Sequence, residues 1–218
     1  MIRVVVVDDE ELVRDGLVVI AGAGPGIEVV GQAADGLEAV SVVARTSPEV
    51  VLMDIRMPRL DGIEATSRIV EHYPASRVLV LTTVETDEVV HAALRAGASG
   101  FLLKSSPREL LWHGIGAVAS GDALLAPSIT RRLIEAHLAA PGPGTGRSLQ
   151  LTDRQTDVVR LVASGLSNRE IAERLHLAET TVKGYLSEVL NRHALRDRTQ
   201  LVVLAYESGL VRPGDSST

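Results

Sequence analysis

The chain has 218 residues, no cysteine, 45% hydrophobic and 23% charged side chains, and a formal net charge of −6. The absence of cysteine excludes a disulfide framework and a thiolate metal site, and no apolar run approaches the roughly 18 residues of a membrane span. Met1 leads directly into an apolar segment without a charged leader and cleavage site, so we expect a cytoplasmic protein with no membrane partner.

Composition predicts two domains. Residues 1–122 carry 18 acidic against 10 basic side chains, whereas residues 148–212 carry 8 against 9. The acidic half is therefore a poor nucleic-acid surface and a plausible metal surface. Between the halves, residues 141–148 read PGPGTGRS, which offers too little apolar surface to pack. We predict domains at 1–122 and 148–212, joined by a helical extension and linker at 123–147 and followed by a tail at 213–218.

Short β-branched runs alternate with amphipathic stretches in the first domain. Their hydrophobicity is continuous, which indicates strands buried on both faces of a parallel sheet that helices cover. The predicted strands lie at residues 2–7, 27–31, 49–53, 77–82 and 99–103. The pattern predicts an α/β fold, namely a doubly wound (βα)₅ parallel-sheet domain.

Polar residues follow the predicted strands at the edge where such sheets bind ligands. They are Asp8 and Asp9 after the first strand, Asp54 after the third, Thr82 at the end of the fourth and Lys104 after the fifth. Any one of them is equally well explained as a strand-end or helix-cap residue, but the whole set favours a site. Three clustered carboxylates need a divalent cation, and oxygen ligands suit Mg²⁺. The cation would offset the charge between an Asp54 nucleophile and a phosphoryl group, whose oxygens Lys104 and Thr82 can bind.

The segments VVDDE, LMDIRMPRLDG, the Thr-bearing end of VLVLTT and AGASGFLLK resemble the receiver domain of two-component response regulators. The resemblance covers about the first 120 residues of the chain. It implies that a partner histidine kinase phosphorylates Asp54. It also implies a Mg²⁺ site of Asp8, Asp9, Asp54 and the backbone carbonyl of Arg56, with Thr82, Phe101 and Lys104 as the phosphoryl-sensing switch. From the sequence alone, Phe101 is a core residue.

From Leu151 onward the pattern changes to four short helices. Thr152 with Gln155, and Ser167 with Glu170, have the spacing of capping boxes and so mark two helix starts. The first helix should end near residue 163, the third should span 180–192 and the fourth should span about 198–208. The second and third helices, joined by a tight turn, fit a helix-turn-helix, whose second member lies in the major groove. The alternative from periodicity is a plain packing bundle.

The predicted third helix has one apolar and one polar face. Val182, Leu186, Val189 and Leu190 should point inward. The segment from LTDRQTDVV to ALRDRTQLVVLAYESG resembles the helix-turn-helix domain of NarL/FixJ (LuxR-type) regulators, over about 60 residues. The resemblance implies that Lys183, Gly184 and Ser187 face bases or phosphates, and that the fourth helix contributes to dimerisation on DNA. We expect DNA contacts from Thr180, Thr181, Lys183, Gly184, Ser187 and Asn191.

This third helix has weak intrinsic stability. Ala178 precedes this helix at the position where members of the NarL/FixJ family often have a Ser cap. A missing cap costs about 1 kcal/mol. Gly184 inside the helix costs about another 1 kcal/mol relative to Ala. Glu188 on the outward arc would meet either repelling phosphates or a cytosine amino group. Affinity should therefore depend on dimerisation.

The sequence as a whole predicts a DNA-binding response regulator that is not an enzyme and forms a homodimer when phosphorylated. An aspartyl-phosphate hydrolase on a similar fold usually carries Asp-x-Asp after its first strand, whereas Asp8 and Asp9 are adjacent here and no cap domain follows. A regulator gated by a diffusible ligand would need an apolar pocket. One Phe, one Trp and three Tyr supply little lining for it.

Overall fold

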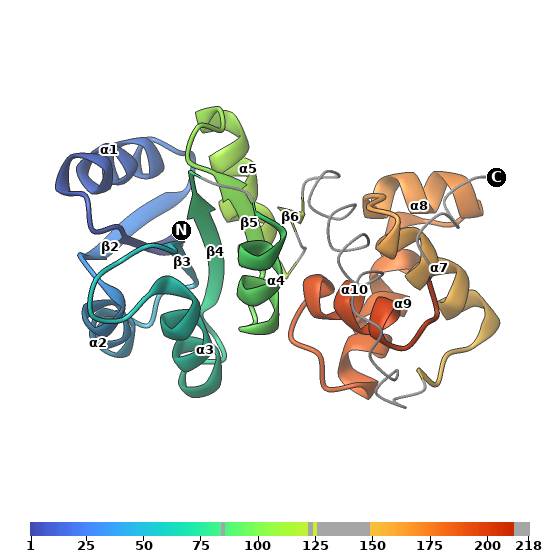
Figure 1. The fold of residues 1–218 in the computed structure, drawn as a ribbon. Coiled ribbons are helices and arrows are strands. Elements are labelled where there is room, and N and C mark those ends of the chain that lie inside the picture. Colours follow the sequence, from blue (N-terminus) through green and yellow to red (C-terminus); the bar gives the residue numbers. More distant parts are fainter. Residues whose placement is uncertain (84–85, 122–123, 126–148, 212–218) are drawn as a thin grey trace. The chain divides into compact units, whose positions relative to one another are not determined.

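A computed structural model describes residues 1–83, 86–121, 124–125 and 149–211. The chain divides into two compact units, Met1–Leu124 and Leu125–Thr218 (Figure 1). The expected linker at 123–147, apart from the two residues 124 and 125, and the expected tail at 213–218 lie outside the described residues. Within the described residues, no helix is long and apolar enough to cross a membrane.

The sheet has the strand order β2-β1-β3-β4-β5-β6, and its neighbouring strands from β2 to β5 are parallel. Its five main strands are β1 (Ile2–Val7), β2 (Ile27–Ala33), β3 (Val50–Asp54), β4 (Arg77–Thr82) and β5 (Gly100–Leu103). They confirm the predicted (βα)₅ fold. A two-residue strand, β6 (Leu124–Leu125), was not predicted, because two residues are too few to show a strand-like pattern of hydrophobicity.

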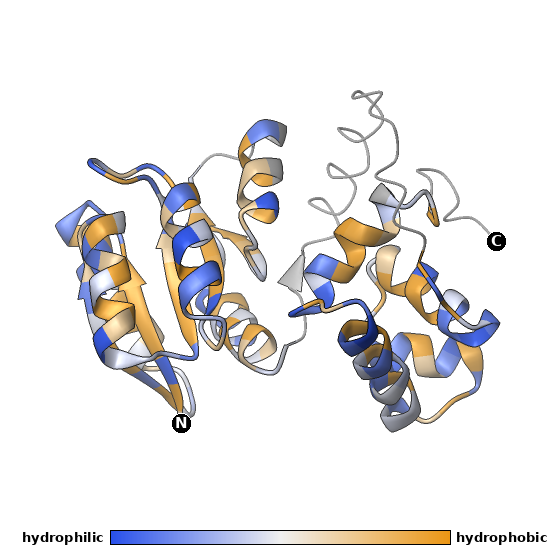
Figure 2. Cartoon of the chain, turned by 90° about the horizontal axis from the view of Figure 1, so that it is seen from below, coloured by the Kyte–Doolittle hydropathy of each residue, from blue (hydrophilic) through white to orange (hydrophobic). Residues whose placement is uncertain are grey.

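Helices cover both faces of this sheet. They are α1 (Glu11–Gly22), α2 (Gly36–Thr46), α3 (Gly62–His72), α4 (Asp87–Arg95) and α5 (Arg108–Ala119). Helix α1 contacts α5, whereas α2 contacts α3 and α3 contacts α4, so the helices form two layers. Alternate strand residues such as Val4 and Leu52 pack against the α1–α5 layer. Figure 2 shows the apolar strands between helices whose outer faces are hydrophilic.

Strand order reverses at β1, which lies between β2 and β3. Chain connections leave the carboxyl ends of β1 and β3 in opposite directions at this point. In doubly wound sheets this arrangement opens a crevice in which ligands bind. The residues that follow β1 and β3 therefore occupy the place where a site is expected.

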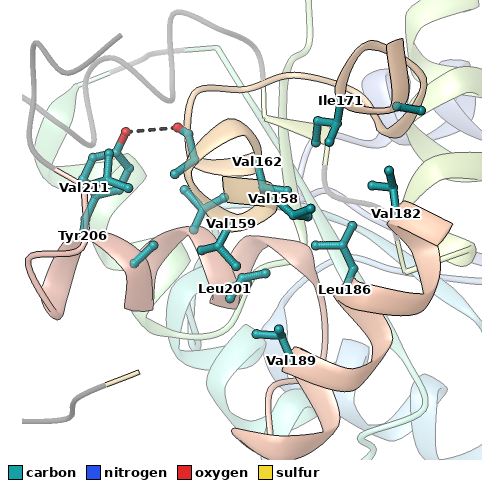
Figure 3. Packing of buried hydrophobic residues seen from close by; sticks show 14 residues of the cluster. Val158, Val159, Val162, Ile171, Val182, Leu186, Val189, Leu201, Tyr206 and Val211 are labelled. Carbon is teal, nitrogen blue, oxygen red and sulfur yellow. Dashed lines mark hydrogen bonds between the residues drawn. The ribbon is translucent and has the colours of Figure 1, made fainter. Parts of the chain in front are cut away.

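The second unit packs four described helices around one core. They are α7 (Asp153–Ala163), α8 (Asn168–Leu175), α9 (Glu179–Arg192) and α10 (Arg198–Glu207). Both predicted capping boxes are present at the starts of α7 and α8, and Ala178 provides no side-chain cap for α9. Figure 3 shows the apolar residues of all four helices meeting in the core, with the Tyr206 hydroxyl donating to the Ala163 carbonyl at 3.0 Å.

Candidate functional site

Three carboxylates meet at the carboxyl edge of the sheet. Val7 of β1 is in register with Met53 of β3, so the next residues, Asp8 and Asp54, lie side by side. One carboxylate oxygen from each of Asp8, Asp9 and Asp54 lies within 4.8 Å of the others. Asp8 and Asp54 are buried, whereas Asp9 is exposed. The cluster is therefore enclosed by the sheet on one side and accessible from the side of Asp9.

Lys104 holds two of these carboxylates. Its Nζ lies 2.7 Å from Asp8 Oδ2 and 3.0 Å from Asp54 Oδ2. Its position is set by β5, which ends at Leu103, and by its own amide, which donates to the Thr82 carbonyl at 2.8 Å. An ammonium group between two buried carboxylates lowers their mutual repulsion.

Burial and charge act in opposite directions on this pair. Burial raises the pKa of Asp54 above its usual value, although the hydrogen bond and charge of Lys104 and the Ile55 amide oppose that rise. Burial acts to lower the pKa of Lys104, but hydrogen bonds and charges from Asp8 and Asp54 outweigh it, so this pKa is raised. Lys104 therefore remains a cation.

The donor set fits a divalent cation. Asp8 Oδ1 accepts from the Glu10 amide at 3.1 Å and Asp54 Oδ1 accepts from the Ile55 amide at 2.8 Å, which fixes the orientation of both carboxylates. One ammonium against three carboxylates leaves the cluster strongly negative. Hard oxygen donors with excess negative charge are what Mg²⁺ and similar ions require. The acidic cluster is consistent with a divalent metal site.

Gly62 lies directly against the backbone of Asp54 and Ile55, a contact that the sequence analysis did not predict. The Gly62 amide donates to the Ile55 carbonyl at 2.9 Å, and a Cβ built on Gly62 would lie 1.8 Å from the carbonyl oxygen of Asp54. Only glycine allows α3 to start this close to the end of β3. The sequence signal for this close approach was the Asp61-Gly62 pair. The Asp61 carboxylate caps α3 by accepting from the Glu64 amide at 2.8 Å.

The remaining residues expected in the first site lie on three neighbouring segments. Thr82 ends β4 and is buried, and Phe101 of β5 is fully buried beside Val80 in the register of the sheet. Arg56, two residues after Asp54, has an exposed side chain in the loop that leads to α3. A sensing role for Thr82 and Phe101 and a ligand role for the Arg56 carbonyl remain predictions.

Helix α9 presents the predicted polar face to solvent. Val182, Leu186 and Val189 are buried in the core, and Leu190 packs partly against it. The residues expected to contact DNA are all exposed: Thr180, Thr181, Lys183, Gly184, Ser187 and Asn191. Lys183 Nζ lies 3.2 Å from Glu179 Oε1, one turn earlier on the same exposed surface. A Cβ added at Gly184 would meet no atom within 4 Å, so there is open space for a side chain at this position.

A hydrogen-bond network around Gln155 includes Glu188, which the sequence analysis placed on the outward arc of the third helix. The buried Gln155 side chain donates from Nε2 to Glu188 Oε2 at 3.0 Å, and its Oε1 accepts from Arg192 Nη1 at 3.2 Å. Arg192 also donates to the Gln150 carbonyl at 3.0 Å. One Glu188 oxygen is thus bound within the domain. Sequence reasoning assigned Gln155 only to the capping box, because its contacts with α9 depend on tertiary packing.

Comparison with known proteins relates both units to described families. Residues 4–115 match the response regulator receiver domain, and residues 149–205 match bacterial regulatory proteins of the luxR family. The transcriptional regulatory protein DegU of Brevibacillus brevis is 36% identical over 225 residues, covering 97% of this chain and 95% of DegU. The DNA-binding transcriptional activator DevR/DosR of Mycobacterium tuberculosis is 37% identical over 213 residues, covering 98% of each chain.

A solved structure covers nearly the same length. It is the response regulator ChrA of a heme-sensing two-component system, which is 33% identical and aligns with a TM-score of 0.54 over 96% of this chain and 98% of ChrA. The order of the two matched families along the chain is the order of the two compact units.

Proposed function

Because this chain belongs to the two-component response regulators that join a receiver domain to a LuxR-type helix-turn-helix domain, we propose that phosphorylation of Asp54 controls its binding to DNA. Membership of this family makes the chain a DNA-binding transcription regulator rather than an enzyme, as the sequence predicted. DNA and a sensor kinase are its implied partners. The observation that carries the proposal is the Lys104 ammonium that bridges Asp8 and Asp54 at 2.7 and 3.0 Å.

The reaction needs a nucleophile, charge neutralisation and a site that responds to the product. An Asp54 carboxylate oxygen attacks the phosphorus of a phosphohistidine on the kinase, a P–O bond forms, and the P–N bond breaks to return the electron pair to the imidazole. A bound Mg²⁺, held by Asp8, Asp9, Asp54 and the carbonyl of Arg56, would offset the negative charges that meet in this step. The Ile55 amide keeps Asp54 oriented through Oδ1 at 2.8 Å.

The phosphorylated site differs from the free site at Lys104. Once Asp54 carries a phosphoryl group, Lys104 pairs with a phosphoryl oxygen in place of the Asp54 carboxylate. The Thr82 hydroxyl donates to another phosphoryl oxygen, and Phe101 adjusts to the movement of Thr82. Thr82 ends β4, Phe101 lies within β5 and Lys104 follows β5, so a charge added at Asp54 changes the surface formed by neighbouring segments.

The second unit binds DNA through α9, whose exposed residues enter the major groove. The receiver occupies residues 1–122 and the DNA-binding domain occupies 148–212, with 123–147 as the connection and 213–218 as the tail. Phosphorylation favours a homodimer, which doubles the number of DNA contacts. The protein acts in the cytoplasm, where its DNA lies.

Incubation of the full chain with acetyl phosphate and Mg²⁺ tests the proposal. We expect one acid-labile phosphoryl group by intact-mass measurement, and none in Asp54→Asn. Asp61→Asn is the matched control, because Asn caps a helix as well as Asp does and Asp61 lies outside the acidic cluster. Unchanged labelling of Asp54→Asn would place the phosphoacceptor elsewhere.

A further inference from the structure

An ion pair outside the acidic cluster ties the loop between β3 and α3 to the start of α2. Arg59 Nη2 pairs with Asp35 Oδ2. Asp35 is fully buried, and its other oxygen caps α2 by accepting from the Glu38 amide at 2.9 Å. The Arg59 side chain is 64% exposed, so it reaches the buried carboxylate from the surface.

The backbone of the loop is held against α2 at the same place. The Gly36 amide donates to the Leu60 carbonyl at 3.1 Å, and a Cβ on Gly36 would lie 2.6 Å from that oxygen. Arg59 has a φ of 65°, in the left-handed region that non-glycine residues avoid. Such a conformation persists when surrounding contacts over-determine it, and the pair with Asp35 is the side-chain contact that does so.

We infer that Asp35 and Arg59 are positioning residues for the phosphoacceptor site, because together they fix the loop whose Arg56 carbonyl completes the cation ligands. This inference rests on the proposed function. Asp8, Asp9 and Asp54 lie at or just after strand ends, whereas Arg56 lies in a loop, so its carbonyl is the one proposed ligand that depends on the loop conformation. Groups that orient ligands typically change metal affinity 10–100-fold when they are removed.

Stabilisation of the fold alone is the competing explanation, and the variants are chosen to separate the two. Asp35→Asn keeps the cap on α2 but removes the charge that Arg59 needs. Arg59→Gly removes the ion pair and also relieves the left-handed backbone, so it should not lower stability by strain. Arg59→Lys retains a cation. Arg68→Ala is the control, because it removes the exposed Arg68–Glu64 pair on α3.

The first measurement is the dissociation constant for Mg²⁺ or Mn²⁺, by calorimetry on the full chain. We expect about tenfold weaker binding in Asp35→Asn and Arg59→Gly, partial recovery in Arg59→Lys, and parent-like binding in Arg68→Ala. The double variant Asp35→Asn with Arg59→Gly should bind no more weakly than either single variant, since residues that act as one unit are not additive.

The second measurement is amide hydrogen exchange of residues 55–62 without metal, which is independent of phosphorylation. Exchange there should be faster in Asp35→Asn and Arg59→Gly than in the parent. Parent-like cation binding in both variants overturns the positioning role, even if exchange is faster. A parent chain that binds no divalent cation overturns the proposed metal site together with this inference, so the two failures are distinguishable.

Discussion

At the scale of single residues, Lys104 contacts both the acidic cluster and the end of β4. Its ammonium pairs with both Asp8 and Asp54, and its backbone amide donates a hydrogen bond to the carbonyl of Thr82. It is also the only lysine in residues 1–122. A group that contacts the phosphoacceptor and a neighbouring strand end is suited to report a new charge.

We therefore predict that Lys104→Ala separates phosphorylation from its effect. The variant should accept one phosphoryl group from acetyl phosphate, because Asp54 and the cation ligands remain, but phosphorylation should no longer tighten DNA binding. The measurement is labelling by intact mass beside a DNA-binding titration with and without phosphodonor. If phosphorylated Lys104→Ala binds DNA as tightly as the phosphorylated parent, Lys104 does not transmit the signal.

A second prediction at this scale concerns Gly62. Since its Cβ would lie 1.8 Å from the Asp54 carbonyl, Gly62→Ala must displace α3 or the end of β3. Overpacking of this kind costs about 1–3 kcal/mol, and we expect weaker Mg²⁺ binding with it. Gly16→Ala in α1 is the control, because nothing lies within 4 Å of that Cβ. Urea unfolding should show the control equal to or more stable than the parent; equal stability of both variants would contradict the close approach at Gly62.

The residues of the site were predictable to different degrees. Asp8, Asp54 and Lys104 follow strands that the sequence pattern already reveals, and parallel strands bring their carboxyl ends to one edge. The Asp35–Arg59 pair and the contacts of Gln155 join segments whose proximity depends on helix packing. No local pattern encodes that proximity, so these contacts could be found only in the structure.

At the scale of elements, α9 combines an exposed polar face with low intrinsic helicity. It has no side-chain cap at Ala178, and Gly184 lies in its interior. Helix boundaries marked by a capping box were predicted well, as at Thr152 and Ser167. Strand β2 extends two residues beyond the prediction, because Gln32 and Ala33 continue the pairing with β1 although their polarity and size give no strand signal.

Gly184→Ala tests how closely α9 approaches its target. The substitution should stabilise the domain by up to about 1 kcal/mol, because alanine favours the helix and the position is open. On DNA, the added methyl group should weaken specific binding if the backbone of α9 enters the groove closely. Thermal unfolding and a binding titration measure the two effects. Higher stability with unchanged DNA affinity would show that this turn of α9 does not touch DNA.

Substitutions of Lys183 and of Glu179 should change DNA affinity in opposite directions. Lys183→Ala should weaken DNA binding, and it should lower the slope of log affinity against log salt by about one if Lys183 contacts a phosphate. Glu179→Gln frees Lys183 from its exposed pair, which contributes little to stability, and removes a charge that repels phosphate. It should therefore raise affinity. Salt titrations on specific and random duplexes distinguish a phosphate role, which affects both duplexes equally, from a base contact, which affects only the specific one.

At the scale of the whole molecule, an acidic receiver is joined to a DNA-binding domain with little net charge. Residues 148–212 carry 9 basic against 8 acidic side chains, and Arg192 is bonded within the domain. Non-specific attraction to phosphates is therefore weak for one copy. Two copies on adjacent half-sites would combine their contacts, so we predict that dimerisation controls DNA binding.

The final prediction is that the phosphorylated chain binds an inverted repeat as a dimer. Recognition helices of such dimers enter the groove about one DNA turn apart, roughly 34 Å. Sedimentation should show a monomer–dimer shift on phosphorylation that Asp54→Asn lacks. Inserting about 5 base pairs between half-sites should abolish dimeric binding, because it places them on opposite faces of the duplex, whereas about 10 should restore it in part. Equal affinity for one half-site and for the full repeat, with or without phosphorylation, would contradict dimerisation as the switch.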